Sequence, residues 1–234
     1  MTPALDIDAV SAGYGEAVVL REIALTVAPG EILAVLGKNG TGKSTLLKSI
    51  MGYLPKLAGR IAIGGADVTR EAPHRIARRG VAYVAQEKSL FQDLSVEENI
   101  RLALASDRDW PKARAAVERS FPFLLERIRQ RAGTLSGGEQ KMLLMARSLA
   151  ADPKLLLVDE ITEGLQPSVI ERLGGVLRAE RGRSATGILL VEQHIPFALA
   201  VADRFVVMDR GEIVDAGAAG APGAAAEIAR HLSL

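Results

Sequence analysis

The sequence predicts an α/β fold in which helices cover both faces of a mainly parallel sheet. Three strongly apolar runs, EILAVLG, KLLLVDE and GILLVEQ, have the character of buried strands. Helical text such as PSVIERLGGVLRAER separates the second run from the third. Strands that are apolar along their whole length and alternate with helices are typical of parallel sheets that are covered on both sides.

Two further segments predict additions to this core. The first 36 residues are rich in strand patterns, such as ALDIDAV and AVVLREIALTV, and RIAIGGADV indicates a hairpin around Gly64-Gly65. From about Ser95 to Ala151 the text is helical. It includes a helix that opens with a capping box, a second helix over about Pro111–Arg119, and a third, GGEQKMLLMARSLAA. The helical block therefore interrupts the α/β core.

Composition limits the class of protein. The chain has 234 residues, 48% of them hydrophobic and 24% charged, which suits one large domain or a domain with an inserted subdomain. The net charge of +1 gives no electrostatic reason to expect a nucleic-acid partner, and the lack of cysteine excludes disulfides and thiolate chemistry. The Ala/Gly-rich residues 216–226 predict a loose linker before a short terminal helix.

The first chemical signal is VLGKNGTGKST, residues 35–45, at the end of an apolar strand. It matches G-x-x-x-x-G-K-[ST], a loop whose backbone N–H groups and following helix bind phosphate. We expect Lys43 to reach the β- and γ-phosphates and the Ser44 hydroxyl to bind Mg²⁺. The alternative is a glycine-rich turn with a surface lysine. The expected nucleotide contacts are Gly37, Lys38, Asn39, Gly40, Thr41, Gly42, Lys43, Ser44 and Thr45.

A second signal is KLLLVDE, which places Asp159 and Glu160 at the carboxyl end of a buried strand. Ligands of open α/β sheets bind at that edge. We expect Asp159 to hold Mg²⁺ through water and Glu160 to polarise the attacking water. The alternative is a strand that meets solvent at its first acidic residue.

A third signal is LSGGEQ, residues 135–140, which opens a long helix with Ser136, Gly137, Gly138 and Glu139. This helix start is a second candidate anion site, although serine and glycine often begin helices. One nucleotide needs only one such site. We therefore expect two copies to face each other, each supplying its second site to the nucleotide of the other.

In this order, GKNGTGKST, LSGGEQ and LLLVDE resemble the ATP-binding subunit of an ABC transporter, and the likeness extends to about Gly217. The resemblance implies a P-loop NTPase (RecA-like) core over about residues 1–88 and 152–217, with an N-terminal antiparallel β-subdomain. It also implies an inserted α-helical signature subdomain over about 89–151, and leaves 218–234 as a C-terminal tail. It implies an ATPase that uses ATP and Mg²⁺ in a head-to-tail homodimer or heterodimer with a second such subunit.

The resemblance assigns two further residues. Tyr14, in SAGYGEAVV, matches the aromatic residue that stacks on adenine, and stacking is physically suited to this role; a core or turn tyrosine is the alternative. Gln86, at the end of GVAYVAQ, matches the glutamine that contacts Mg²⁺ and bends toward the membrane subunit.

VAYVAQEKSLFQDLSVEENI, EGLQPSVIERLG and ILLVEQH further resemble the ATPases of branched-chain amino-acid uptake and their urea and amide relatives. This implies a peripheral protein on the cytoplasmic face of the inner membrane. Its partners would be two permeases, fed by a periplasmic solute-binding protein. An export or lipid-extraction ATPase and a non-transport scaffold remain alternatives. Leu90 and Phe91 are expected either to line a groove for a permease helix or to lie in the subdomain core.

The chain departs from the family pattern at two places. Ile161 and Gln166 stand where proline and aspartate are usual, so we expect a slightly looser turn after Glu160. The histidine switch of the family has two candidates, Gln193 and His194. In the family this histidine stands ten residues before the aspartate of the segment that opens the next strand. Here that aspartate is Asp203, so the resemblance favours Gln193 as the residue that contacts the γ-phosphate, with His194 beside it.

Overall fold

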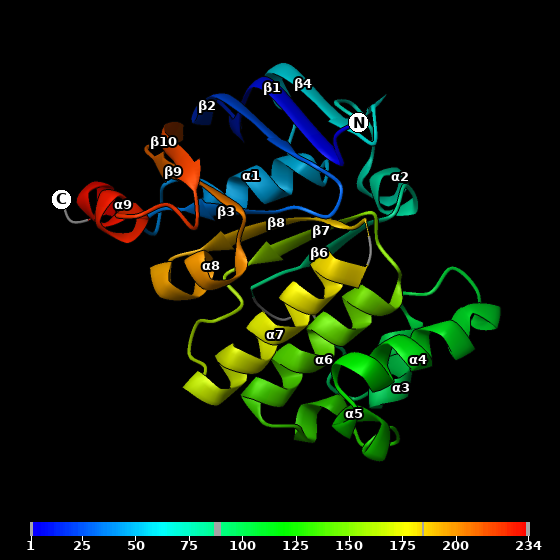
Figure 1. The fold of residues 1–234 in the computed structure, drawn as a ribbon. Coiled ribbons are helices and arrows are strands. Elements are labelled where there is room, and N and C mark those ends of the chain that lie inside the picture. The colour runs from blue at the N-terminus through cyan, green and yellow to red at the C-terminus, as the bar shows by residue number, and fades with distance from the viewer. Residues whose placement is uncertain (1, 87–89, 184, 233–234) are drawn as a thin grey trace.

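The computed structural model describes residues 2–86, 90–183 and 185–232, which form two β-sheets and the helices around them (Figure 1). The strands are β1 Leu5–Tyr14, β2 Ala17–Val27, β3 Ile32–Leu36, β4 Lys56–Ile63, β5 Ala66–Asp67, β6 Val81–Val84, β7 Leu155–Asp159, β8 Gly187–Glu192, β9 Arg204–Asp209 and β10 Glu212–Ala218. The helices are α1 Lys43–Ile50, α2 Pro73–Arg78, α3 Val96–Arg101, α4 Trp110–Ser120, α5 Phe123–Glu126, α6 Gly137–Ala150, α7 Pro167–Arg183, α8 Ile195–Val201 and α9 Ala224–Leu232.

The larger sheet has six strands in the order β10-β9-β3-β8-β7-β6. All its pairs are parallel except β9 with β10. Every residue of β3, β7 and β8 is buried, as their unbroken apolar text predicts. The predicted α/β fold is confirmed. Because parallel strands end at one edge, the residues after β3, β6, β7 and β8 gather there.

The smaller sheet is antiparallel, in the order β2-β1-β4-β5, and lies over one face of the larger sheet with α1 between the two (Figure 1). Apolar residues of both sheets and α1, among them Leu5, Leu20, Leu33, Leu46 and Leu157, form one buried cluster. The hairpin predicted around Gly64-Gly65 joins β4 to β5, and both glycines have positive φ. Helix α1, which follows the glycine-rich loop, is therefore held from both sides.

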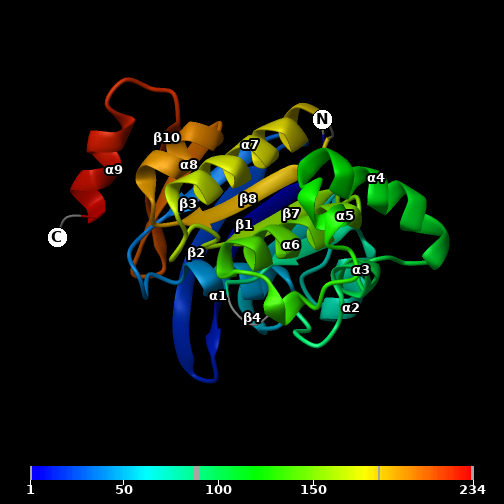
Figure 2. The same cartoon turned by 90° about the horizontal axis from the view of Figure 1, so that it is seen from below.

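The opposite face of the larger sheet carries α6 and α7, with α3, α4 and α5 extending beyond them (Figures 1 and 2). Their apolar side chains join those of the sheet in a second buried cluster that includes Phe121, Leu143, Leu173 and Ile161. Capping boxes begin two of these helices, α3 at Ser95 and α6 at Ser136. Helix α6 is thus fixed to the same core as β7 and β8.

The predicted loose linker over residues 216–226 is wrong at both of its ends. Residues up to Ala218 pair with β9 as part of β10, and α9 begins at Ala224. Ile228 of α9 is fully buried in a cluster with Phe205 and Ala198, which explains why this segment is ordered against the sheet. A low-complexity composition did not predict it, because small side chains also suit an edge strand that packs under a helix.

Candidate nucleotide site

The glycine-rich loop connects the end of β3 to the start of α1. A Cβ atom on Gly37 would lie 2.6 Å from both the Met208 carbonyl oxygen and Thr41 Oγ1, so no larger residue fits there. Gly42 precedes the helix with φ of 103°, a left-handed conformation that other residues rarely adopt. The loop is therefore shaped by contacts that only glycine allows.

Lys43 points back into this loop. Its Nζ donates hydrogen bonds to the carbonyl oxygens of Gly37 and Lys38, at 2.9 and 2.8 Å, and lies 3.0 Å from Glu160 Oε1. The side chain is only 3% exposed. The first turn of α1 contains no acidic residue, and no side chain caps it. This combination leaves a buried cation and an uncapped helix end facing the same space, which suits an anionic phosphate.

Asp159, the last residue of β7, is held by two hydroxyl groups. Ser44 Oγ donates to its Oδ1 at 3.1 Å, and the Tyr83 hydroxyl donates to its Oδ2 at 3.0 Å. Burial raises the pKa of the Asp159 carboxyl, while these two hydrogen bonds oppose the rise. Burial likewise raises the pKa of Tyr83, with the Asp159 charge adding to the effect. Tyr83 is a site neighbour that no motif in the sequence indicated. Its position in β6, three residues before Gln86, was the only sign that it could lie near Asp159.

The Ser44–Asp159 pair fits Mg²⁺ bound together with nucleotide phosphates. Among the described residues no group of three or more acidic or histidine side chains could hold a metal ion alone. Mg²⁺ usually takes one or two carboxylates and completes its shell with phosphate oxygens and water. The hydroxyl and carboxylate present here match that pattern.

Glu160 begins the turn after β7 with φ of 44°, and its N–H donates to the Val191 carbonyl oxygen at 3.0 Å. Besides Lys43, its carboxylate accepts a hydrogen bond from Gln86 Nε2 at 3.0 Å. The same Gln86 nitrogen donates to Glu163 at 2.6 Å. Lys43 and Gln86 therefore both bind Glu160, which lies where a nucleotide phosphate and its water would approach Lys43.

The side chains of Gln193 and His194 have different surroundings: of these two described residues, only Gln193 bonds through its side chain to the glycine-rich loop. Gln193 Nε2 donates to Asn39 Oδ1 in the glycine-rich loop at 2.6 Å, whereas His194 is exposed and precedes α8 without capping it. Both border a cavity of about 380 Å³ that also touches Glu160. A neighbouring cavity of about 320 Å³ is bordered by Lys43, Ser44, Thr45 and Gln86, and it shares Asn39 and Glu160 with the first. The structure thus brings the residues of the glycine-rich loop and those after β7 and β8, which the sequence predicted as one site, to two adjoining cavities.

Two residues near this site escaped the sequence analysis. Glu192, 2% exposed, accepts hydrogen bonds from Thr162, which is itself buried. Burial raises the pKa of the Glu192 carboxyl, and the bonds from Thr162 oppose that rise. The sequence sign that could have indicated Glu192 is a glutamate at the end of an otherwise apolar strand, GILLVE.

The remaining predicted residues lie apart from the two cavities. Tyr14 ends β1 and is 48% exposed, and it borders neither cavity. None of the signature residues Ser136–Glu139 borders either cavity. Glu139 accepts from the Ser136 N–H at 2.9 Å, the largest cause of the lowered pKa of its carboxyl. Ser136 and Gly137 are exposed, so within one copy this helix start faces solvent.

The family model of the ABC transporter matches residues 20–163. The high-affinity branched-chain amino acid transport ATP-binding protein BraG of Pseudomonas aeruginosa is 39% identical over 219 residues, covering 92% of this chain and 94% of that protein. The lipopolysaccharide export system ATP-binding protein LptB of Escherichia coli K12 is 35% identical over 204 residues, covering 85% and 84%. The solved structure of an ATP-binding subunit of an ABC transporter superposes with a TM-score of 0.85 at 26% identity, over 99% of this chain and 100% of that one.

Proposed function

This chain belongs to the ABC transporter family and is an ATPase, and we propose that its ATP hydrolysis energises the uptake of branched-chain amino acids or related small polar solutes. The observation that carries the solute class is the 39% identity to BraG over nearly the full length of both chains. Lipid export is the second candidate, because LptB is 35% identical over a similar span.

The site residues supply the steps of hydrolysis. The glycine-rich loop and Lys43 would bind the phosphates, and Ser44 and Asp159 would hold Mg²⁺, which would supply positive charge against the transferred phosphoryl group. Nucleotide phosphates compete with Glu160 for Lys43, which frees the carboxylate to orient and deprotonate the attacking water. Gln193, which borders the same cavity as Glu160, has an amide that can donate a hydrogen bond to the γ-phosphate. Glu160 is then the only base in the reaction.

A second subunit completes the site in this proposal. Members of the family dimerise and work with transmembrane permeases. Here Ser136 and Gly137 are exposed and border neither cavity of their own copy. They are therefore available to the nucleotide of a second copy or of a related subunit, and Tyr14 lies free at the tip of its hairpin to stack on adenine.

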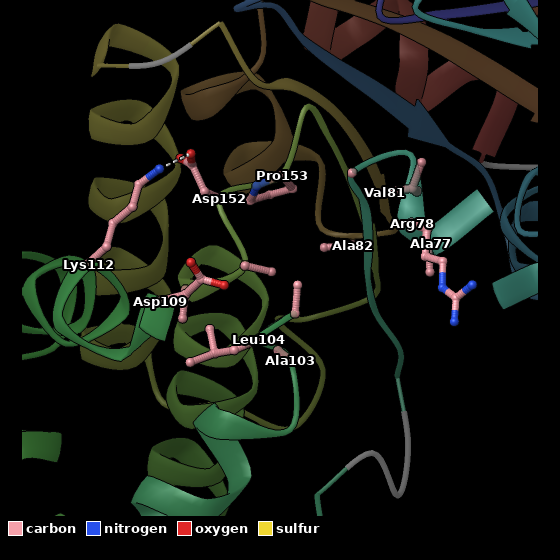
Figure 3. A pocket seen from close by; sticks show the side chains of 14 residues that line it. Ala77, Arg78, Val81, Ala82, Ala103, Leu104, Asp109, Lys112, Asp152 and Pro153 are labelled. Atoms are coloured by element: carbon pink, nitrogen blue, oxygen red, sulfur yellow. Dashed lines mark hydrogen bonds and ion pairs between the residues drawn. The ribbon is translucent and has the colours of Figure 1, made fainter. Parts of the chain in front are cut away.

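No helix in the described ranges is long and apolar enough to cross a bilayer. In this proposal the permease docks on a surface of the chain. A cavity of about 370 Å³ lies between α2, β6, the segment after α3 and the end of α6 (Figure 3). Leu104, Val81 and Pro153 give it an apolar lining, and the Lys112–Asp152 ion pair of 2.7 Å lies at its side. We assign this cavity to a short permease helix, and Phe91, which does not border the cavity, is a separate candidate contact for the same partner.

For Leu90 and Phe91 the sequence left two alternatives, burial in the core of the helical block or contact with a permease helix, and the two residues differ. Leu90 packs against the core of the helical block, whereas Phe91 is 58% exposed. Replacing Phe91 by alanine should therefore leave the fold and the basal ATPase intact and lower permease-coupled transport. A thermal unfolding measurement separates this outcome from a fault in folding.

The test of the function is purification from detergent-solubilised membranes followed by reconstitution in vesicles. We expect two permease subunits to co-purify, and leucine to enter the vesicles when ATP and a periplasmic binding protein are supplied. Glu160→Gln vesicles are the matched control. Lipid extraction without amino-acid uptake would favour the second candidate, and purification without any membrane subunit would favour a scaffold ATPase.

A further inference from the structure

Strand β8 has a special position in the sheet. It lies between β3, which leads into the glycine-rich loop, and β7, which ends at Asp159. Its last residue, Glu192, therefore leaves the sheet between the loop that binds phosphate and the turn that carries Glu160. The next residue is Gln193, which contacts Asn39 of the glycine-rich loop.

The hydrogen bonds of Glu192 reach the turn after β7 and the backbone that follows β8. Oε1 accepts from the Thr162 N–H at 3.2 Å, and Oε2 accepts from the Thr162 hydroxyl at 2.8 Å. Oε2 also accepts from the Gln193 N–H at 3.3 Å. One carboxylate thus joins the turn after β7 to the residue that follows β8.

The carboxylate is costly to keep. Glu192 is 2% exposed, and burial raises its pKa, as expected for a charge removed from water. An apolar residue at this position would avoid the cost, as at the other five positions of β8. The hydrogen bonds from Thr162 and from the Gln193 N–H offset the cost of burying this carboxylate.

The backbone of the turn after β7 is tied to β8 at two places, through the Glu160 N–H, which donates to the Val191 carbonyl oxygen at 3.0 Å, and through Thr162. Glu160 adopts φ of 44°, and Ile161 leaves its own φ unrestricted, where a proline would fix it. The Ile161 side chain packs into the core. Thr162, the next residue, donates two hydrogen bonds to the Glu192 carboxylate, one from its N–H and one from its hydroxyl.

We propose that Glu192 is a positioning residue that sets the catalytic distance between Glu160 and Gln193 by holding Thr162 and the Gln193 backbone on one carboxylate. It touches neither Lys43 nor Ser44 and serves as neither base nor ligand. This proposal rests on the roles assigned to Glu160 and Gln193 and is independent of the transported solute.

The test compares kcat and KM of the full-length chain. Glu192→Gln keeps the shape of the side chain but presents an N–H₂ group to donors, so we expect kcat for ATP hydrolysis to fall about tenfold. The KM for ATP should change less than about threefold, because the phosphate loop is untouched. Thr162→Val should lower kcat about fivefold and Thr162→Ser should restore it, since serine keeps the hydroxyl.

Two buried residues away from the site provide matched controls. Glu180, on α7, is paired with Arg183, and the Thr186 hydroxyl donates to Pro153 at 2.6 Å. Glu180→Gln and Thr186→Val make the same chemical changes, and we expect kcat within about twofold of wild type at a temperature where each variant is folded.

A double-mutant cycle gives the sharpest result. Adding Thr162→Val to Glu192→Gln should lower kcat by less than about twofold further, because both changes remove the same bond. Multiplicative losses, an unchanged kcat in Glu192→Gln, or equal kcat for Thr162→Val and Thr162→Ser would each overturn the proposal. Should Glu192→Gln not fold, the Thr162 pair decides alone. Full activity in Glu160→Gln would instead remove the site assignment on which the proposal rests.

Discussion

The N-termini of α1 and α6 have the same electrostatic polarity but are satisfied in different ways. At α1, Gly42 supplies no side-chain cap, and the nearby charge is the buried cation of Lys43. At α6, the Ser136 hydroxyl accepts from the Glu139 N–H, and the Glu139 carboxylate accepts from the Ser136 N–H at 2.9 Å. The α1 end is open in the sense that its own helix supplies no cap, and the carboxylates near it, Glu160 and Asp159, come from β7 and the turn that follows. The α6 end is closed by a carboxylate of its own helix.

This difference shows what a helix start needs in order to bind phosphate. The N-terminus of α3 has the same capping box as α6, at Ser95 and Glu98, in a segment with no phosphate signature. The box is therefore a structural device at both helices. At α6 the residues Ser136 and Gly137 beside the box are exposed. The proposed function assigns this surface to the phosphate of a second copy.

The largest effect is expected at the open end. Glu160→Gln should lower ATP hydrolysis by roughly 10²- to 10⁴-fold, because it removes the general base, while the glycine-rich loop still binds nucleotide. We expect an ATP-dependent dimer in size-exclusion chromatography, since bound ATP is no longer consumed. Hydrolysis within about twofold of wild type would remove Glu160 from this role.

The second effect concerns the residues after β8. Gln193→Ala removes the hydrogen bond to Asn39, and we expect ATPase activity to fall about tenfold. His194→Ala, next to it and exposed, should stay within about twofold because its side chain caps nothing. The reverse order of the two activities would show that the register favouring Gln193 is wrong.

The open helix end was predictable from the sequence, because its chemistry is local. Consecutive residues from Gly37 to Thr45 form the loop, and Asp159 and Glu160 follow an apolar strand whose direction determines where they lie. The parallel sheet followed from the same apolar runs. Tertiary neighbours such as Tyr83 on Asp159, or Glu192 on Thr162, join residues 76 and 30 positions apart. No spacing in one sequence reveals such pairs.

After β9 the sequence predicted the short terminal helix, which α9 confirms, but it did not predict that residues up to Ala218 pair as β10. Ala and Gly suggested a linker, but burial of Ile228 against Phe205 orders the segment. Small residues leave room for a helix to approach a strand closely, and composition alone does not distinguish that use from flexibility.

The third prediction separates the two capping boxes. Ser136→Ala and Ser95→Ala should each cost about 1 kcal/mol of stability, because each removes the same helix cap. Only Ser136→Ala should also lower ATPase activity, by about fivefold, since only that hydroxyl is assigned to a phosphate. Matched unfolding and ATPase measurements test this. Equal activities in the two variants would mean that the α6 box acts as a cap alone.

The smallest effect is expected at Tyr83, which supports the open end through Asp159. Its hydrogen bond lowers the pKa of a carboxyl that burial has raised, so Tyr83→Phe should raise that pKa further. With a higher pKa, a smaller fraction of Asp159 is ionised at a given acidic pH. The acidic limb of the pH profile of ATPase activity should therefore move to higher pH. We expect a loss of about threefold in activity on that limb and a smaller loss on the alkaline side, where the carboxyl is ionised in both proteins. Titrating Mg²⁺ at fixed ATP should show a weaker apparent affinity on the same limb. Parallel profiles, displaced only in height, would show that Tyr83 packs β6 against β7 without tuning Asp159.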